Sequence, residues 1–189
     1  MIYSLMTDFT FVTGRQEKVK WFEKIIGRPV RHHKMELDEI QSLDLKEVVE
    51  KKLRSAYEAL RAPVVIEDCA AEFVAFKRLP GTFIKFFLDE LGLEGVCRMV
   101  DGRDRTATAR CIIGFTDGRV TKLFEGRLDG EISMHPQGNG GFGFDKILAP
   151  SGYGGKTRAE LSEHDDIETY RQLKPFDKLV EWLEGYEGI

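Results

Sequence analysis

A short, uninterrupted apolar run that ends in two acids restricts the possible folds of this chain more than any other segment. Residues 63–66 read Pro-Val-Val-Ile, and Glu67 and Asp68 follow directly. An unbroken run of this kind is typical of a strand buried on both faces, as in sheets that helices cover on both sides. We therefore expect a central strand at residues 63–66, with Glu67 and Asp68 at its end, facing a cleft.

The segments before this run alternate between strand and helix patterns. Residues 10–12 are β-prone and end at Thr13-Gly14, and apolar residues then recur at helical spacing up to Gly27. Residues 29–34 form a possible second strand. The first quarter of the chain thus predicts a strand, a glycine turn, a helix and a strand.

The clearest helix begins at Asp44, which has Glu47 in the capping-box position. It ends before Pro63, because the residue that precedes a proline disfavours helical backbone. After the apolar run, residues 72–76 alternate like a half-exposed strand, and residues 82–91 have a helical pattern.

The second half of the chain changes to antiparallel patterns. Residues 105–116 and 119–124 are β runs joined by a tight turn, and the Asp-Gly pair at 129–130 is another turn signal. A glycine-rich loop, residues 138–145, precedes a last helix with its apolar stripe at residues 176–183. This order predicts an α/β protein with a mixed sheet.

Size, charge and cysteine usage exclude several classes of protein. A chain of 189 residues favours one domain, residues 1–189, at most built as two lobes around a cleft. The formal charge of −4 disfavours a nucleic-acid partner, because affinity for phosphate backbones requires an excess of basic side chains. The three widely spaced cysteines indicate neither a disulfide framework nor a zinc ribbon, and no apolar stretch approaches the ~18 residues of a membrane span. We expect a cytoplasmic protein with no membrane partner.

The turn after the first strand is a candidate phosphate site. Thr13 and Gly14 precede a helix, whose free backbone N–H groups and positive dipole end suit an anion, and Arg15 and Lys18 add positive charge. The segment matches neither a Walker A motif nor a dinucleotide fingerprint. An ordinary strand-to-helix turn with surface cations is therefore the alternative interpretation.

Three acids are candidates for a metal site. Glu39, Glu67 and Asp68 offer the carboxylate oxygens that Mg²⁺ prefers, while the ion keeps waters for a phosphate substrate. Acids are also common on solvated surfaces, and that is the alternative for these three.

The glycine-rich loop is a candidate site for a flat ring. Phe142 and Phe144 can stack on an aromatic base, and Asp145 can accept hydrogen bonds from its polar edge. The alternative is a flexible turn that its phenylalanines anchor to the core.

Taken in order, six segments resemble the inosine triphosphate pyrophosphatase family. They are Phe11-Val12-Thr13-Gly14 with Lys18, Leu37-Asp38-Glu39, residues 64–68, residues 79–87, residues 142–145 and residues 156–162. The resemblance spans nearly the whole chain. It implies an elongated mixed α/β fold with two lobes around a central active-site cleft, assembled as a homodimer.

The resemblance also implies a reaction. Family members hydrolyse a nucleoside triphosphate to the monophosphate and pyrophosphate by attack at the α-phosphorus, which removes unwanted purine nucleotides such as ITP and XTP from the pool. Mg²⁺ is the expected cofactor, with Mn²⁺ as an alternative. Glu39 and Asp68 match the metal-holding acids, Glu67 is a third candidate, and Asp68 is also the candidate for positioning or deprotonating water.

The substrate contacts follow from the same resemblance. The lysines that face the phosphates are matched by Lys18, Lys51 and Lys85. Phe142, Phe144 and Asp145 match the base pocket, and Arg171 matches the arginine of a terminal Ser-His-Arg motif.

Three departures from the family pattern concern the substrate. Arg15 replaces an asparagine, Asp165 aligns with a base-reading lysine, and Thr169, Tyr170 and Arg171 replace Ser-His-Arg. An ionised aspartate only accepts hydrogen bonds, whereas lysine and histidine donate to the carbonyl oxygen of hypoxanthine or xanthine. We therefore expect ITP and XTP to be poorer substrates here, and a base with an exocyclic amino group to be preferred.

Two alternatives stay open at this point. A gap in the alignment would let Lys174 or Lys156 replace the lost cation, which restores the family preference. The departures also suggest a nucleotide-binding protein that has lost catalysis, although the presence of both metal-holding acids counts against that.

Overall fold

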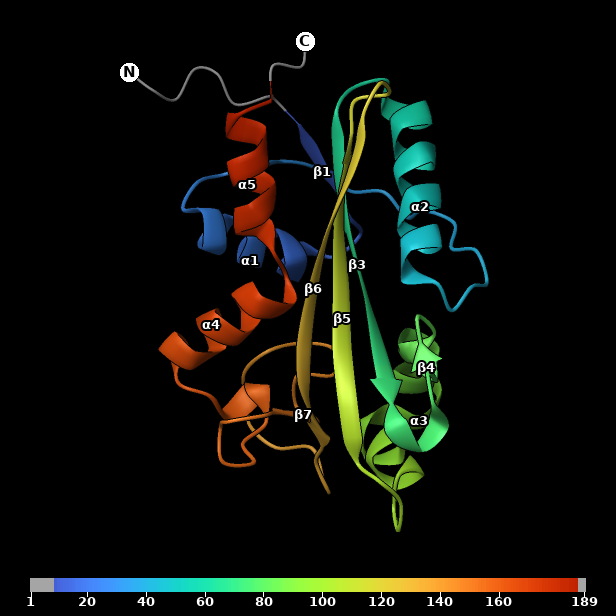
Figure 1. Ribbon diagram of the computed structural model, residues 1–189, viewed down its shortest axis with the longest axis vertical. Coiled ribbons are helices and arrows are strands. Elements are labelled where there is room, and N and C mark those ends of the chain that lie inside the picture. The colour runs from blue at the N-terminus through green and yellow to red at the C-terminus, as the bar shows by residue number, and fades with distance from the viewer. Residues whose placement is uncertain (1–8, 187–189) are drawn as a thin grey trace.

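Seven strands and five α-helices make up residues 9–186, the part of the chain that this computed structural model describes (Figure 1). The strands are β1 (Thr10–Val12), β2 (Arg31–His33), β3 (Val64–Phe73), β4 (Pro80–Gly81), β5 (Thr106–Thr116), β6 (Thr121–Ile132) and β7 (Leu148–Pro150). The helices are α1 (Gln16–Ile26), α2 (Leu45–Leu60), α3 (Ile84–Met99), α4 (Glu163–Leu173) and α5 (Phe176–Glu184), with 3₁₀ turns at Val74–Phe76 and Arg158–Glu160. Among these residues, the structure contains no helix with the length and apolar character that a membrane span requires.

All seven strands belong to one mixed sheet. Its order is β2-β1-β3-β5-β6-β7, with β4 also paired to β3. β1 runs parallel to β2 and β3, and the remaining pairs are antiparallel. Figure 1 shows α1, α4 and α5 on one side of the long central strands and α2 on the other. The predicted α/β class with a mixed sheet is confirmed.

The neighbours of β3 change along its length. On one side β5 pairs with all ten residues of β3, whereas on the other side β1 pairs only with Val64 and Val65. β4 rejoins that side at Ala71 and Glu72. Among the described strands, none pairs with residues 66–70 on this side, so the sheet is open there, beside the acids.

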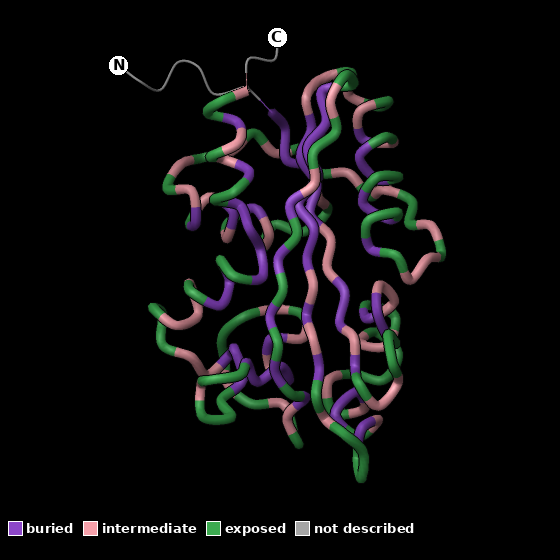
Figure 2. Tube along the Cα trace, in the orientation of Figure 1, coloured by how far each residue is buried: buried purple, intermediate pink, exposed green. Residues whose placement is uncertain are grey.

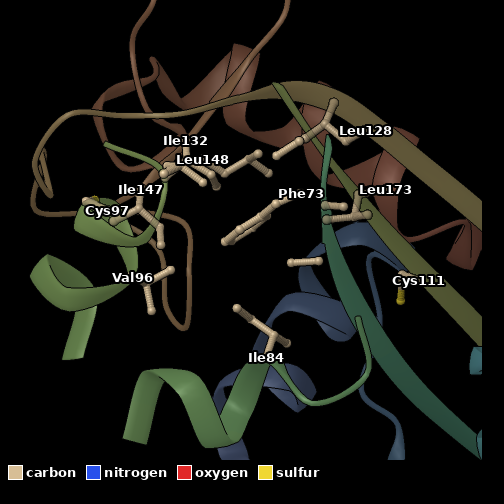
Figure 3. Packing of buried hydrophobic residues seen from close by; sticks show 14 residues of the cluster. Phe73, Ile84, Val96, Cys97, Cys111, Leu128, Ile132, Ile147, Leu148 and Leu173 are labelled. Carbon is tan, nitrogen blue, oxygen red and sulfur yellow. The ribbon is translucent and has the colours of Figure 1, made fainter. Parts of the chain in front are cut away.

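Buried residues recur along the strands of the sheet (Figure 2) and form three hydrophobic clusters with the helices that cover it. One cluster of buried residues surrounds Phe73 and joins α3 to the first half of β5, the second half of β6 and β7 (Figure 3). A second joins α1 and α5 to the sheet through Phe11, Phe22 and Phe176, whose rings contact one another. A third joins α2 to the sheet. The helices and strands around the unpaired residues 66–70 of β3 are thus fixed by hydrophobic packing.

The prediction that Glu67 and Asp68 end a strand was wrong. β3 continues through both acids to Phe73, and residues 74–76, expected as part of another strand, form a 3₁₀ turn. The apolar run at residues 64–66 resembles a complete strand because β1 flanks β3 only at its beginning. Beyond that point β3 borders the open stretch, so polar side chains are tolerated in mid-strand.

Two further differences have local causes. Residues 129–130 lie inside β6 rather than in a turn. The glycine that suggested a turn has another reason, because a Cβ atom at position 130 would lie 2.2 Å from the Ala149 oxygen of β7. The glycine therefore permits close pairing with β7. Helix α4 was not predicted, since its first turn is acidic and only Thr169, Tyr170 and Leu173 of this helix are buried.

Candidate active site

A cleft of about 510 Å³ opens at the unpaired stretch of β3. It is bounded by the turn between β1 and α1, the segment that precedes α2, the beginning of α3, and the glycine-rich loop together with the end of α4. The predicted site residues that line it are Thr13, Gly14, Arg15, Lys18, Glu39, Glu67, Asp68, Lys85, Phe142, Phe144 and Asp145. Segments far apart in the sequence therefore meet here.

Glu39 and Asp68 meet at the ammonium group of Lys52. Lys52 Nζ donates to Glu39 Oε1 and to Asp68 Oδ2, each at 2.5 Å. The other oxygen of Asp68, Oδ1, accepts from the Cys69 backbone N–H at 2.9 Å, which fixes the orientation of the carboxylate. The side chains of Glu39 and Asp68 are 40% and 19% exposed, so both carboxylates remain accessible from the cleft.

The structure does not bring Lys51, predicted at the phosphates, into the cleft. Lys51 is exposed and lies outside the cleft, whereas Lys52 is buried and lines it. Helical geometry separates the two, because consecutive residues point about 100° apart. The buried residues Leu45, Val49 and Ala56 place Lys52 on the inner stripe of α2. That spacing was visible in the sequence and would have selected Lys52.

Glu67 is the buried counterion of two lysines. Its Oε1 lies 2.9 Å from Lys174 Nζ and 3.3 Å from Lys18 Nζ, and the Glu67 side chain has no exposed surface. Burial by itself raises the pKa of Glu67, but the charges of Lys174 and Lys18 outweigh it and lower this pKa from 4.5 to about 2. Burial likewise lowers the pKa of each lysine, but the negative charges around it, that of Glu67 first among them, together outweigh burial, so that both pKa values lie above the ordinary one. Glu67 stays ionised between two cations.

Glu67 does not fit the predicted role of metal ligand. Neighbouring residues of a strand point to opposite faces, so Asp68 faces Lys52 of α2 while Glu67 faces Lys18 of α1 and Lys174. The Glu67 side chain has no exposed surface and faces two ammonium groups, so a further cation neither reaches it nor is attracted to it. The two adjacent acids thus differ in access: Asp68 is partly exposed in the cleft, whereas Glu67 is fully buried at its wall against two lysines.

The phosphate side of the cleft combines side chains with helix ends. Thr13 and Gly14 precede α1, and the Thr13 hydroxyl accepts from the Arg15 backbone N–H at 3.2 Å. Lys18 Nζ also donates to the Glu67 carbonyl of β3 at 3.1 Å. Lys85 is exposed in the first turn of α3. The N-terminal ends of two helices and three cations therefore border the same cavity, an arrangement that favours anions.

The loop side of the cleft carries aromatic rings and the Lys174 ammonium. Lys174 Nζ lies 4.9 Å from the Phe142 ring centroid and 4.7 Å from that of Tyr170. Asp145 is buried, and its Oδ2 accepts from the Phe142 backbone N–H at 2.9 Å, while its Oδ1 accepts from Arg158 at 2.7 Å. Asp145 therefore shapes the loop as well as facing the cavity.

Besides Lys51, three predicted substrate contacts lie outside the cleft lining. Asp165 accepts from the Ser162 hydroxyl at 2.7 Å at the start of α4. Tyr170 is buried and stacks on Trp21 at 4.3 Å. Arg171 points toward α1 and α5, where it donates to the Ile25 carbonyl at 3.3 Å. The helical turn of α4 sends these side chains elsewhere, and Lys174, just after the helix, enters the cleft instead.

The acid pair Glu39 and Asp68 fits a hard divalent cation. Both carboxylates reach one ammonium at 2.5 Å, so their oxygens lie close together, and both are accessible. Two carboxylates, with room left for water and phosphate oxygens, match the preferences of Mg²⁺.

Comparison with known proteins decides the family. The model of the Ham1 family matches residues 9–182. The chain belongs to the Ham1 family. An inosine triphosphate pyrophosphatase of Emericella nidulans is 37% identical over 183 residues, covering 94% of this chain and 97% of that protein. A dITP/XTP pyrophosphatase of Saccharolobus solfataricus is 34% identical over 170 residues, covering 89% and 88%.

The Ham1 fold agrees as well. The solved Ham1 protein of Staphylococcus aureus superposes with a TM-score of 0.67 at 26% identity, covering 93% of this chain and 98% of that one.

Within this Ham1 chain, four charged residues that line the cleft were not predicted as site residues: Lys52, Arg158 and the acids Glu36 and Asp38. Arg158 lies in the family-like segment 156–162, but its place in the site depends on its buried partner Asp145, which the sequence does not indicate.

Proposed function

We propose that this chain is a nucleoside triphosphate pyrophosphatase that hydrolyses the triphosphate to the monophosphate and pyrophosphate. Its substrates are purine nucleotides that do not belong in the cellular pool, as the names of its relatives suggest. The single observation that supports this most is the meeting of Glu39, Asp68 and Lys52 in a cleft that five further cationic side chains line. We place the protein in the cytoplasm.

The phosphate tail lies between Arg15, Lys18 and Lys85 in this proposal. Phosphoryl transfer requires little covalent chemistry from a protein, so positioned cations that neutralise the developing charge supply most of the rate enhancement. Glu39 and Asp68 would hold Mg²⁺, or Mn²⁺ in its place, which neutralises phosphate charge when bound. Lys52 holds the two carboxylates together and changes partners toward phosphate oxygens as the substrate enters.

Asp68 is the residue that handles the attacking water. Its carboxylate accepts a proton from a water whose oxygen attacks the α-phosphorus, and the bond from that phosphorus to the bridging oxygen breaks to release pyrophosphate. The Cys69 backbone N–H holds one oxygen of Asp68, so the other is oriented toward the cleft. Positioning of this kind is a general contribution to hydrolysis.

Lys174 replaces the base-reading cation in this proposal. Asp165, whose negative charge was the reason to expect an amino-bearing base, lies outside the cleft. Lys174 carries three N–H donors, and Glu67 accepts from it at 2.9 Å, so further donors remain for a ligand. Phe142 offers a ring beside it. We therefore expect a purine with a 6-carbonyl, as in ITP or XTP, to be preferred over one with a 6-amino group.

The test of the reaction is a product analysis. The protein is incubated with Mg²⁺ and a panel of triphosphates, and pyrophosphate, orthophosphate and monophosphate are quantified. Release of pyrophosphate in equal amount to the monophosphate supports the proposal, and orthophosphate alone contradicts it. Asp68→Asn should remove most activity, while Asp89→Asn, at an exposed position of α3, serves as the matched control.

A nucleotide-binding protein without catalysis is the second candidate. It predicts that nucleotides raise the melting temperature although none is hydrolysed. The two accessible carboxylates at Lys52 favour the enzyme, because a binding protein needs cations for the phosphates but not an acid that handles water.

The assembly is proposed from the family resemblance. We propose a homodimer of chains that each form one domain over residues 1–189. Sedimentation equilibrium measures the mass of the particle in solution, and a mass of one chain at micromolar concentration contradicts the dimer.

A further inference from the structure

Two cysteines face each other across neighbouring strands beside the cleft. Cys69 of β3 and Cys111 of β5 are directly paired in the antiparallel register. Residues paired in this way have Cα atoms about 4.5–5.5 Å apart, within the range of about 4.4–6.8 Å that disulfides span. The two Sγ atoms and a Glu67 carboxylate oxygen all lie within 4.8 Å of one another. Both cysteines are free thiols.

The two thiols differ in access from the cleft. Cys69 is half-buried and lines the cavity, whereas Cys111 has no exposed surface and lies behind it in the cluster around Phe73. The third cysteine, Cys97, is buried on α3. Figure 3 shows Cys97 and Cys111 at opposite sides of that cluster. The chain thus contains one cysteine that a small reagent can reach, one cysteine opposite it, and one that stands apart.

We propose that Cys69 and Cys111 are a site of reversible oxidation, at which a small hydroperoxide converts the two thiols into a disulfide that slows the enzyme. The Cys69 sulfur attacks the peroxide oxygen, the O–O bond breaks, and sulfenic acid and one water or alcohol form. The Cys111 sulfur then attacks the Cys69 sulfur, the S–O bond breaks, and a second water leaves with the remaining thiol proton. The two sulfurs lose two electrons in total, and the peroxide gains them.

The consequence for the cleft follows from the Cys69 proton. Cys69 Sγ–H donates to Glu67 Oε1 at 3.2 Å, the same oxygen that pairs with Lys18 and Lys174. A disulfide has no proton to donate, so this oxygen loses one partner, and both lysines face a differently polarised carboxylate. The new bond also ties β3 to β5 next to Asp68. Slower turnover rests on the proposed pyrophosphatase function, whereas formation of the disulfide does not.

The test begins with the unmodified full chain. The protein is treated with hydrogen peroxide, digested under non-reducing conditions and mapped by mass spectrometry, and its free thiols are counted in denaturant. We expect the count to fall from three to one, a cross-linked peptide that joins the segments around Cys69 and Cys111, and full reversal by dithiothreitol. Three remaining thiols, a bond between two chains, or overoxidised Cys69 without the cross-link would overturn the proposal.

Variants and activity complete the test. Cys111→Ala should abolish the cross-link, and Cys97→Ala should leave it intact, while mapping of the unmodified chain does not depend on either variant folding. Pyrophosphate release should fall at least tenfold on oxidation and return on reduction. If the cross-linked protein releases pyrophosphate as fast as the dithiol form does, the proposed effect on turnover is overturned. If the reduced protein releases no pyrophosphate from any nucleotide, the proposed function fails, and the mapping still reports on the disulfide.

Discussion

Replacement of Lys52 by methionine is the sharpest test of the cleft. Methionine keeps much of the length and apolar volume of lysine but removes the ammonium that joins Glu39 and Asp68 at 2.5 Å. The neighbouring variant Lys51→Met makes the same chemical change on the exposed face of α2. Any difference between the two variants therefore reports on position alone.

The magnitude follows from the two contacts. A hydrogen bond to a charged partner contributes about 1.5–3 kcal/mol, and we take the lower end because Glu39 and Asp68 are 40% and 19% exposed. Lys52→Met should then lower the free energy of unfolding by about 3 kcal/mol, or roughly 6–12 °C in melting temperature for a chain of this size. Loss of a positioned charge should lower kcat/KM by about 10²–10³-fold. Lys51→Met should change stability by less than about 0.5 kcal/mol.

Calorimetry with and without Mg²⁺ separates the two functions of Lys52. With the ammonium removed, the two carboxylates repel each other and are free for a cation, so Mg²⁺ should raise the melting temperature of Lys52→Met more than that of Lys51→Met. Pyrophosphate release is measured on the same samples. Equal loss of stability and activity in both variants would refute the assignment of Lys52, and an equal response to Mg²⁺ would refute the site at Glu39 and Asp68.

Three further outcomes are expected. Lys174→Met should lower kcat/KM for ITP more than for ATP, because the 6-carbonyl loses its donor; a proportional loss for both would show that Lys174 does not read the base. The pKa of Glu67 is lowered from 4.5 to about 2 in the folded protein, so the stability it contributes is present above the unfolded pKa and is lost as the pH falls toward 2; a flat unfolding free energy between pH 5 and 2 would contradict this. Gly130→Ala should destabilise the protein by several kcal/mol, since its Cβ atom would lie 2.2 Å from the Ala149 oxygen; chemical denaturation measures this, and an unchanged midpoint would show that β7 moves freely.

Local patterns predicted most of the elements that surround the cleft. The apolar stripe of α2 and the N-cap at Asp44 could be predicted because both depend on residues close in sequence. The middle of β3 was predicted wrongly. A polar residue in a strand can mark the end of the strand or the wall of a cleft, and here the difference depends on where β1 ends. β1 lies some 50 residues away along the chain, as the pairing of Phe11 with Val65 shows.

Side-chain direction limited the prediction of the site itself. A match to a family pattern identifies a segment, but a shift of one residue on a helix turns the side chain away, as Lys51 and Lys52 illustrate. The same applies to α4, where Tyr170 is buried against Trp21 and Lys174 reaches the cleft. Glu67 and Asp68 were grouped because they are adjacent, although a strand sends neighbours to opposite faces.

The interrupted pairing of β3 has a consequence for self-association. An exposed strand edge offers free backbone groups to a second polypeptide, which is a route to aggregation. Here Lys18 donates to the Glu67 carbonyl, and Asp68 accepts from the Cys69 N–H, so two charged side chains occupy the places that an invading strand would use. The side chains proposed to act on the substrate therefore also hinder the pairing of a second strand with β3, which is the first step of fibril growth. Inactive variants intended to remain monodisperse should keep polar residues at Lys18 and Asp68.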